Sequence, residues 1–426
     1  MVIRTPDFSI PVTFVGSQSN DDAGYGQGTS IKWHDAVSDH VADPDTAFSL
    51  LGRAAMRAPS NSAIRLDIGN ILLDRFDFGG AATAFAAALQ IDPAHNDARL
   101  GLARCWSRLE RYADVLALID DAAGSRSANS HYLHGMAALG LEQRDLAERD
   151  FRSALDEDPK HREAAFQLGR LLRDGNRLDE FEILCNDLWA KGARHVQMCL
   201  DHGRILAAAG QDDAARALLF APEKITQVML DVPGEFADLD AFNAALAEEL
   251  LSNPYPITDV PTDELAMRGA TRIHHLMNGQ RPELIQTLLA AITAQIDRDV
   301  AGRIASASSN DLWLQCRPAS AQLRAWGLIQ GSGAYEEWHT HRGGWLSGVY
   351  YIAIPDKFTT DGDGDGAGCI ELGPPKSLAD RYPETLRIAP QAGMLLLMPS
   401  HVHHRTIPFV SQGKRISFAF DVRMLD

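Results

Sequence analysis

Three prolines that each follow a helical segment recur at a regular spacing, and this repeat restricts the fold more than any other feature of the chain. Pro93 follows Pro59 by 34 residues, and Pro159 follows Pro93 by 66, which is about two periods. Small and aromatic residues stand at the same offsets before two of these prolines: Gly69, Ala81, Phe85 and Ala88 before Pro93, and Gly135, Ala147, Phe151 and Ala154 before Pro159. Such a pattern indicates helix pairs that stack one on the next.

These residues resemble the tetratricopeptide repeat over roughly residues 46–220. The small residues let two helices approach closely, the aromatic fills the space between them, and the proline ends the second helix. Weaker copies of the pattern contain Ala103, Ile119, Ala122, Gly169, Gly203 and Ala215. The resemblance implies an N-terminal α-solenoid whose concave groove docks a peptide or protein. The sequence is also compatible with a homodimer.

Composition excludes several classes of protein. Apolar residues make up 45% and charged residues 23% of the 426-residue chain, a globular balance. A net charge of −17 argues against a nucleic-acid partner, because binding to phosphates relies on clustered Lys and Arg. The five cysteines are scattered, which favours a reducing cytoplasm, and no stretch approaches the ~20 apolar residues of a membrane span.

Changes in composition and in hydrophobic periodicity along the chain predict four segments and a multidomain α + β protein. Residues 1–45 read as an irregular lead-in with one β-like run from Phe8 to Val15, and 46–220 as the repeat array. Residues 221–309 read as a helical segment that supports the next domain. Residues 310–426 contain five strand-like runs, WLQCR, LRAWGLIQ, LSGVYYIAIP, GMLLLMP and RISFAFDV. An antiparallel sandwich or barrel is expected there, with DGDGDG (361–366) as a hairpin insertion rather than a calcium loop.

Histidines in this last segment form two groups, W-His339-T-His341 and S-His401-V-His403-His404. Clustered imidazoles in a strand-rich domain are typical of a transition-metal site, and residues two apart in a strand point to the same side. His404 follows an apolar strand that a sheet can bring to the same point. Arg415 opens the last strand with Ser417 on the same face, a pairing suited to a planar carboxylate.

The ordered set of His339, SGVYYI, GMLLLMPS, His404 and Arg-Ile-Ser resembles the double-stranded β-helix dioxygenases, closest to a prolyl-hydroxylase-like branch. The resemblance covers about residues 310–426 and implies a jelly roll that uses iron(II), 2-oxoglutarate and O2. It makes His339 the first metal ligand and His404 the last. It also implies that Arg415, helped by Ser417 and Tyr351, binds the distal carboxylate of 2-oxoglutarate.

One position departs from the pattern of that family. Most members carry Asp or Glu two residues after the first histidine, where this chain has His341. Three readings stay open: His341 completes a three-histidine site, Glu336 or Glu337 supplies a carboxylate, or the position is vacant or the domain inactive. Because His341 is large and a competent ligand, hydroxylation is favoured over halogenation.

The predicted function is hydroxylation of a peptide or protein side chain docked by the repeats. The alternatives are a hydroxylase of small molecules, a non-catalytic repeat scaffold with a cupin-like metal-binding domain, and a zinc hydrolase with Glu337 as base. The remaining candidates read as structural: His401 and His403 in a loop, His274 and His275 in a helix, and Trp326, Trp338 and Trp345 in a core or pocket wall.

Overall fold

The computed structural model describes residues 31–37, 44–121, 126–220, 222–234, 236–258, 267–306, 311–356 and 366–425. These residues form two compact units, one within Asp43–Ala193 and one within Arg194–Asp426 together with the strand near residue 32. The run from Phe8 to Val15 and all but the last residue of DGDGDG lie outside the described residues. In the described part, no helix has the length and apolarity needed to cross a membrane.

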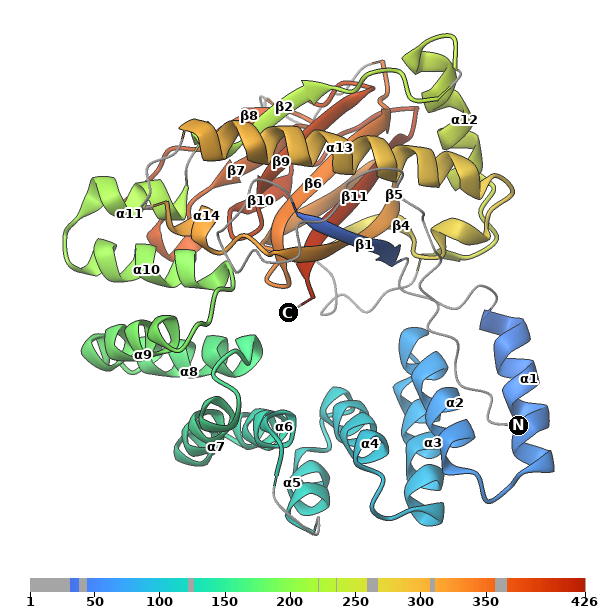
Figure 1. Cartoon of the computed structure of the whole chain (residues 1–426), viewed down its shortest axis with the longest axis vertical. Helices are drawn as coiled ribbons and strands as arrows, with labels where there is room; N and C mark the ends of the chain where they lie inside the picture. Colours follow the sequence, from blue (N-terminus) through green and yellow to red (C-terminus); the bar gives the residue numbers. More distant parts are fainter. Residues whose placement is uncertain are drawn as a thin grey trace. The chain divides into compact units, whose positions relative to one another are not determined.

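The described part of the first unit consists of helices that pack in consecutive pairs, such as α2 with α3 and α6 with α7 (Figure 1). Its helices are α1 (Pro44–Arg57), α2 (Ser62–Asp74), α3 (Phe78–Ile91), α4 (Asn96–Arg108), α5 (Tyr112–Asp120), α6 (Ala128–Gly140), α7 (Arg144–Glu157), α8 (Arg162–Asp174) and α9 (Leu178–Ala190). The predicted α-solenoid is confirmed.

Contacts between small and aromatic residues hold the helix pairs together. A Cβ atom on Gly69 would lie 2.5 Å from the ring of Phe85, and one on Gly135 would lie 2.8 Å from that of Phe151. Both phenylalanines are fully buried. The aromatic ring therefore occupies the space that the missing side chain leaves, as the repeat pattern predicts.

Replacing Gly135 by leucine should lower the free energy of unfolding of the repeat unit by at least about 1–3 kcal/mol, because the new side chain overpacks the contact with Phe151. Gly52→Leu is the matched control, since a Cβ there has no neighbour within 4 Å. Urea denaturation followed by circular dichroism measures both. Equal midpoints for the two variants would show that the glycine–aromatic contact does not stabilise the repeats.

The second unit is built on a sheet that has eleven strands in the described residues, in the order β2-β9-β6-β11-β5-β10-β7-β8. Off this path, β1 and β4 pair with β5, and β3 pairs with β4. The strands are β1 (Lys32–Val37), β2 (Thr226–Met229), β3 (Pro256–Ile257), β4 (Met267–Ile273), β5 (Ser320–His339), β6 (Gly344–Ala353), β7 (Ile370–Gly373), β8 (Leu386–Ile388), β9 (Met394–Pro399), β10 (His403–Thr406) and β11 (Arg415–Met424). All pairs are antiparallel except β1 with β5.

The long strand β5 joins two parts of the sheet. Its first part pairs with β11, whereas its last residues pair with β10, which continues to β7 and β8. The sheet thereby curls on itself, and the predicted jelly roll, or double-stranded β-helix, is confirmed. This curl brings the end of β5 and the start of β10 together.

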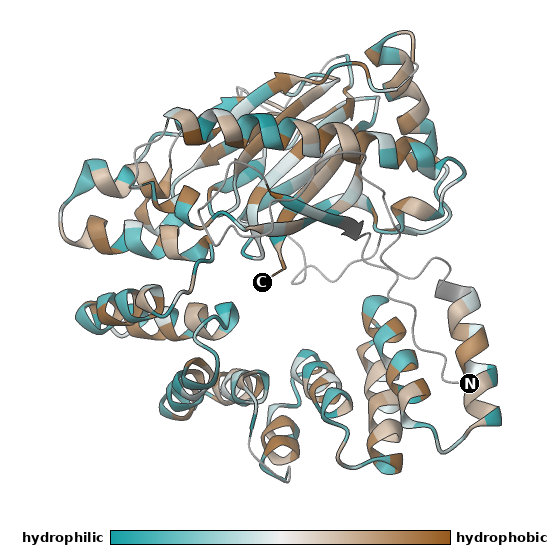
Figure 2. Ribbon diagram, in the orientation of Figure 1, coloured by the Kyte–Doolittle hydropathy of each residue, from teal (hydrophilic) through white to brown (hydrophobic). Residues whose placement is uncertain are grey.

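The second unit also contains helices, some of which lie against the outer face of the sheet. The helical elements of the unit are α10 (Gln197–Ala208), α11 (Asp212–Leu219), η1 (Pro222–Lys224), α12 (Leu239–Leu251), η2 (Leu276–Asn278), α13 (Pro282–Ser306), α14 (Leu312–Gln315) and η3 (Lys376–Leu378). Helix α13 runs across the sheet, and its apolar and polar residues alternate as expected for a helix with one covered side (Figures 1 and 2). On β6, the Tyr350 hydroxyl donates to Asn243 of α12 at 2.7 Å.

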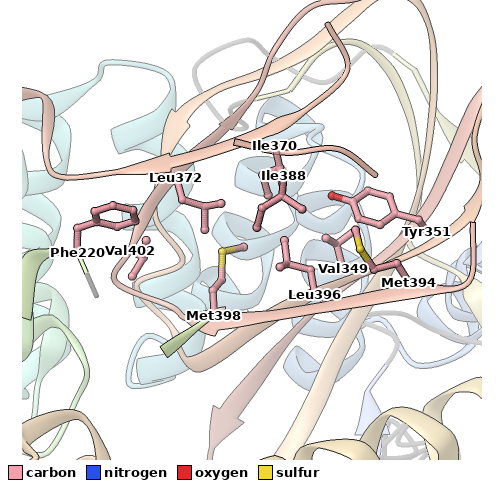
Figure 3. Packing of buried hydrophobic residues seen from close by; sticks show 10 residues of the cluster. All are labelled: Phe220, Val349, Tyr351, Ile370, Leu372, Ile388, Met394, Leu396, Met398 and Val402. Atoms are coloured by element: carbon pink, nitrogen blue, oxygen red, sulfur yellow. The ribbon is translucent and has the colours of Figure 1, made fainter. Parts of the chain in front are cut away.

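The inner face carries an apolar cluster and the candidate site. Side chains alternate along β11, so that Phe418 and Phe420 point away from the face that holds Ser417 and Asp421. The cluster contains Phe220, Val349, Tyr351, Ile370, Leu372, Ile388, Met394, Leu396, Met398 and Val402, and Figure 3 shows Tyr351 at one end of it. Apolar packing therefore borders the polar groups described below.

Two expectations about secondary structure are wrong. WLQCR (313–317) is not a strand: its first three residues lie in α14, and Cys316 and Arg317 follow that helix. The Asp311 side chain caps α14 by accepting from the backbone N–H groups of Trp313 and Leu314. The segment with His274 and His275 is not a helix: these residues follow β4, which pairs with β5. Tertiary pairing with a neighbouring strand overrides the local helical pattern there.

The helix pair α10–α11, which contains Gly203 and Ala215 of the weakest repeat copy, lies in the second unit. Its buried residues pack with Tyr382 of the β domain, and the Tyr382 hydroxyl donates to Asp212 at 2.6 Å. The last repeat-like helix pair therefore packs against the β domain. The domain boundaries themselves stay a prediction.

Candidate metal centre and co-substrate site

Three histidines from two strands and a turn meet on the inner face. One nitrogen from each of His339, His341 and His404 lies within 4.8 Å of the other two. His339 ends β5 and is the direct cross-strand partner of His404 on β10. His341 lies two residues past the end of β5, where its backbone N–H donates to the Ser400 carbonyl at 2.9 Å. The expected convergence of His339 and His341 thus occurs through a turn rather than along one strand.

Each ring is oriented by a hydrogen bond at Nδ1. The acceptors are the Glu337 carbonyl for His339 at 2.7 Å, the Val402 carbonyl for His404 at 3.0 Å and the Asp421 carboxylate for His341 at 2.8 Å. Carbonyl and carboxylate oxygens only accept, so Nδ1 carries the proton in all three rings. The Nε2 atom of each ring is then left as the metal-binding atom, in the arrangement common to histidine ligands.

The buried environment keeps two of the three imidazole rings in the neutral form that a metal ion requires. Burial lowers the pKa of His404 well below its usual value, and the neighbouring imidazoles lower it further. Burial also lowers the pKa of His339. Burial acts in the same sense on His341, but the Asp421 carboxylate outweighs it and raises the pKa of that ring. Near neutral pH, His339 and His404 are therefore neutral, as metal-binding imidazoles must be.

The two glutamates considered for the middle position have other partners. The Glu337 side chain is half-exposed and pairs with Arg268 at 3.2 Å. Glu336 accepts a hydrogen bond from the Thr406 hydroxyl at 3.3 Å. Among the described residues, the group that fits a metal contains His341 and neither of these acids. The geometry therefore favours the three-histidine reading.

A second polar site lies on the same face, around Arg415. This side chain is buried, its Nη1 donates to the Gly368 carbonyl at 2.9 Å, and its guanidinium lies 5.0 Å from the centre of the Tyr351 ring. Ser417 is the cross-strand partner of Tyr351. Burial raises the pKa of Tyr351 to about 12, so its hydroxyl stays a hydrogen-bond donor at neutral pH.

Several buried atoms of this second site have no hydrogen-bond partner within the described residues: Arg415 Nε, the Ser417 hydroxyl, the Tyr351 hydroxyl and both amide atoms of Gln330. An unsatisfied buried polar group costs roughly 1–3 kcal/mol. A planar carboxylate that accepts from the guanidinium and the two hydroxyls would remove most of that cost. The residues present therefore fit the carboxylate of a 2-oxo acid.

His401, His403, His274 and His275 lie outside the metal-binding group. His401 is buried, its Nε2 hydrogen-bonds the Leu218 carbonyl of α11 at 2.8 Å, and burial lowers its pKa to about 4. Burial likewise lowers the pKa of His403 to about 4. His274 is buried, and His275 stacks edge-on against Tyr255 at 5.2 Å.

The three tryptophans differ in their distance from the site. Trp345 stacks on Trp313 at 4.7 Å, and each indole N–H donates to the other's backbone carbonyl. Trp338 lies under the Arg405 guanidinium at 5.2 Å. Trp326 stacks on the His341 ring at 5.8 Å with an interplanar angle of 12°. Trp326 thus contacts a histidine of the metal-binding group.

Two residues near the site are absent from the sequence-based candidates. Asp421 contacts His341, and Gln330 is the cross-strand partner of Arg415. Asp421 could have been found from the sequence, because it stands six residues after Arg415 and strand alternation places both side chains on one face. Gln330 lies in LRAWGLIQ and gave no signal beyond being polar in an apolar strand.

Together, the fold and the site define a helical-repeat protein with a jelly-roll domain that carries a three-histidine group and a buried arginine. Residues 324–421 match the family described as "Putative 2OG-Fe(II) oxygenase", and residues 72–139 and 132–193 match two tetratricopeptide-repeat families. The chain is therefore a fusion of tetratricopeptide repeats with a C-terminal domain of the 2OG-Fe(II) oxygenase class. The resemblance to tetratricopeptide repeats and the resemblance to iron(II)/2-oxoglutarate oxygenases, both drawn from the sequence, are thus confirmed as matches to these families.

Comparison with solved structures gives repeat proteins. YrrB, described as a TPR protein with an unusual peptide-binding site, is 22% identical, with 42% of this chain and 90% of that chain covered and a TM-score of 0.32. MamA from Desulfovibrio magneticus RS-1 is 21% identical over 34% of this chain and 84% of that chain, with a TM-score of 0.32. PilF of Pseudomonas aeruginosa is 15% identical over 41% of this chain and 88% of that chain, with a TM-score of 0.35. A comparison with curated proteins gave no match.

Proposed function

We propose that the protein is an iron(II)- and 2-oxoglutarate-dependent dioxygenase that hydroxylates a side chain of a peptide or protein bound by the repeats. The observation that supports this best is the pairing of two sites on one face of the sheet. One is a group of three histidines with every Nδ1 hydrogen-bonded, and the other is a buried arginine beside unpaired hydroxyls. A plain metal-binding barrel has no need for the second.

Each residue has a defined task in this reaction. His339, His341 and His404 would hold iron(II), each through its Nε2 atom. Arg415 binds the distal carboxylate of 2-oxoglutarate, with Ser417 and Tyr351 donating from their hydroxyls. With iron(II) and 2-oxoglutarate bound, the centre uses O2 to convert a substrate C–H bond to C–OH, and 2-oxoglutarate becomes succinate and carbon dioxide.

Apolar and aromatic side chains border part of the proposed site. The apolar cluster around Tyr351 borders the co-substrate site, and Trp326 covers the His341 ring. Apolar surroundings strengthen the electrostatic contacts of the polar groups that they border.

The repeats support a polypeptide substrate, because helical-repeat arrays present extended surfaces that bind peptides and proteins. All five cysteines are free thiols, which supports the proposal of a cytoplasmic location.

Incubation of the full chain in cell extract with iron(II), 2-oxoglutarate and isotopically heavy dioxygen tests the proposal, with His404→Ala as the matched inactive control. Heavy oxygen is expected in side chains of one or a few polypeptides, together with succinate, and only with the native chain. One heavy oxygen atom is expected in succinate whatever the substrate is, because each turnover divides O2 between succinate and the hydroxylated product. Label in a small molecule other than succinate, with none in polypeptides, would contradict the polypeptide substrate and favour a small-molecule hydroxylase. Absence of both label and succinate would contradict the oxygenase itself.

A further inference from the structure

We propose that Asp421 is a positioning residue of the metal site, which supplies through His341 the negative charge that a carboxylate ligand would otherwise provide directly. This inference rests on the proposed function, since it requires that the three histidines hold a metal. It explains how a site with histidine in the middle position keeps a carboxylate next to the metal centre.

Asp421 is held in place by a closed set of hydrogen bonds. Its carboxylate accepts from His341 Nδ1 at 2.8 Å and from the Ser347 hydroxyl at 2.7 Å. Ser347 has one proton and donates it to Asp421, so the Ser400 hydroxyl, 2.7 Å away, donates to Ser347. The Ser400 carbonyl in turn accepts from the backbone N–H of His341 at 2.9 Å. The ring and the backbone of His341 are thus fixed by one connected network.

The carboxylate makes His341 different from the other two ligands. His339 and His404 donate from Nδ1 to neutral backbone carbonyls. His341 alone of the three donates to an anion, and this anion is buried, with 6% of its surface exposed. A buried carboxylate on the far nitrogen of a metal-bound imidazole makes that imidazole a stronger ligand and fixes its tautomer.

The charge balance at the metal leads to the same conclusion. Three neutral imidazoles contribute no charge to a divalent cation, whereas two histidines and a carboxylate contribute one negative charge. With Asp421 one imidazole away, the site regains that charge without losing the third nitrogen ligand. In the low-dielectric interior such a charge acts over this distance more strongly than it would in water.

If Asp421 only stabilised the fold, its substitution would have a different effect on metal binding. A double-mutant cycle with His341 separates this structural role from the positioning role. Asp421→Asn keeps the size and a hydrogen-bond acceptor but removes the charge. If Asp421 acts through His341, the substitution should weaken metal binding by roughly 10- to 100-fold in the native chain. In a His341→Ala background, the same substitution should change metal affinity by less than about twofold.

The measurement is anaerobic calorimetric titration of the full chain with iron(II) and, separately, with cobalt(II), whose visible absorption also reports the ligand geometry. Equal losses of affinity in both backgrounds would overturn the inference, because the effect would then not pass through His341. If Asp421→Asn fails to fold, Ser347→Ala takes its place in the same double-mutant cycle, because this variant keeps the carboxylate but removes one of its hydrogen bonds. Ser347→Ala should then weaken metal binding less than Asp421→Asn, and only in a chain that retains His341. Failure of the native chain to bind either metal would instead contradict the proposed function.

Discussion

Replacing His404 by alanine is expected to weaken iron(II) binding by more than about 100-fold, and thereby to stop the conversion of 2-oxoglutarate to succinate at iron concentrations that saturate the native chain. His404 is the most buried of the three histidines and the cross-strand partner of His339, so its loss removes one ligand and opens the centre. The loss of affinity should exceed the roughly 10- to 100-fold that removal of an outer hydrogen-bond partner causes. Anaerobic calorimetry with iron(II) measures it, with circular dichroism as the check on folding.

His403→Ala is the matched control, because the neighbouring side chain on a strand points to the opposite face. It should leave iron binding within about twofold of the native chain, since His403 is not part of the group that fits a metal. If the two substitutions weaken iron binding equally, the assignment of the ligands on β10 is wrong.

Replacing Arg415 by alanine is expected to weaken 2-oxoglutarate binding by about 100-fold while iron(II) binding stays unchanged. Truncating one partner of a buried, hydrogen-bonded charge pair costs about 2–5 kcal/mol, and each 1.4 kcal/mol is a factor of ten in affinity. The variant also leaves Tyr351 without the guanidinium over its ring. Titration of the iron-loaded chain with 2-oxoglutarate in the absence of O2 gives the dissociation constant.

Arg415→Lys separates charge from shape in the same titration. Lysine keeps the positive charge but not the planar pair of donors, so an intermediate affinity is expected. An unchanged dissociation constant in Arg415→Ala would show that the co-substrate, if it binds, uses another group. Loss of iron binding in Arg415→Ala would show that the two sites are not separate.

The parts of the fold that the sequence predicts correctly are those determined by local chemistry. The pairing of glycine with phenylalanine recurs within single helix pairs, and the apolar runs at 346–355, 393–399 and 415–422 form β6, β9 and β11. Prediction fails where a single contact decides the structure. One side chain, Asp311, caps a short helix that contains the first three residues of WLQCR, and pairing with β5 makes a strand of 267–273.

The candidate site shows the same division. Strand alternation and the order of the motifs led to His339, His404, Arg415 and Ser417, because these residues lie on strands. The middle ligand stayed open in the sequence because His341 lies in a turn, whose position depends on a bond to Ser400 far along the chain. Asp421 was missed for a related reason, since its contact with His341 exists only when β11 and the end of β5 meet.

Anaerobic titration of the iron(II)-loaded full chain with 2-oxoglutarate tests the central claim most directly, through the weak visible absorption of the iron–2-oxoglutarate chelate. The account predicts a band that saturates at one 2-oxoglutarate per chain, that is much weaker in Arg415→Ala at the same concentration and that is absent in His404→Ala. A native chain that shows no band and retains zinc instead of iron would contradict the oxygenase and leave a zinc hydrolase or a metal-binding scaffold.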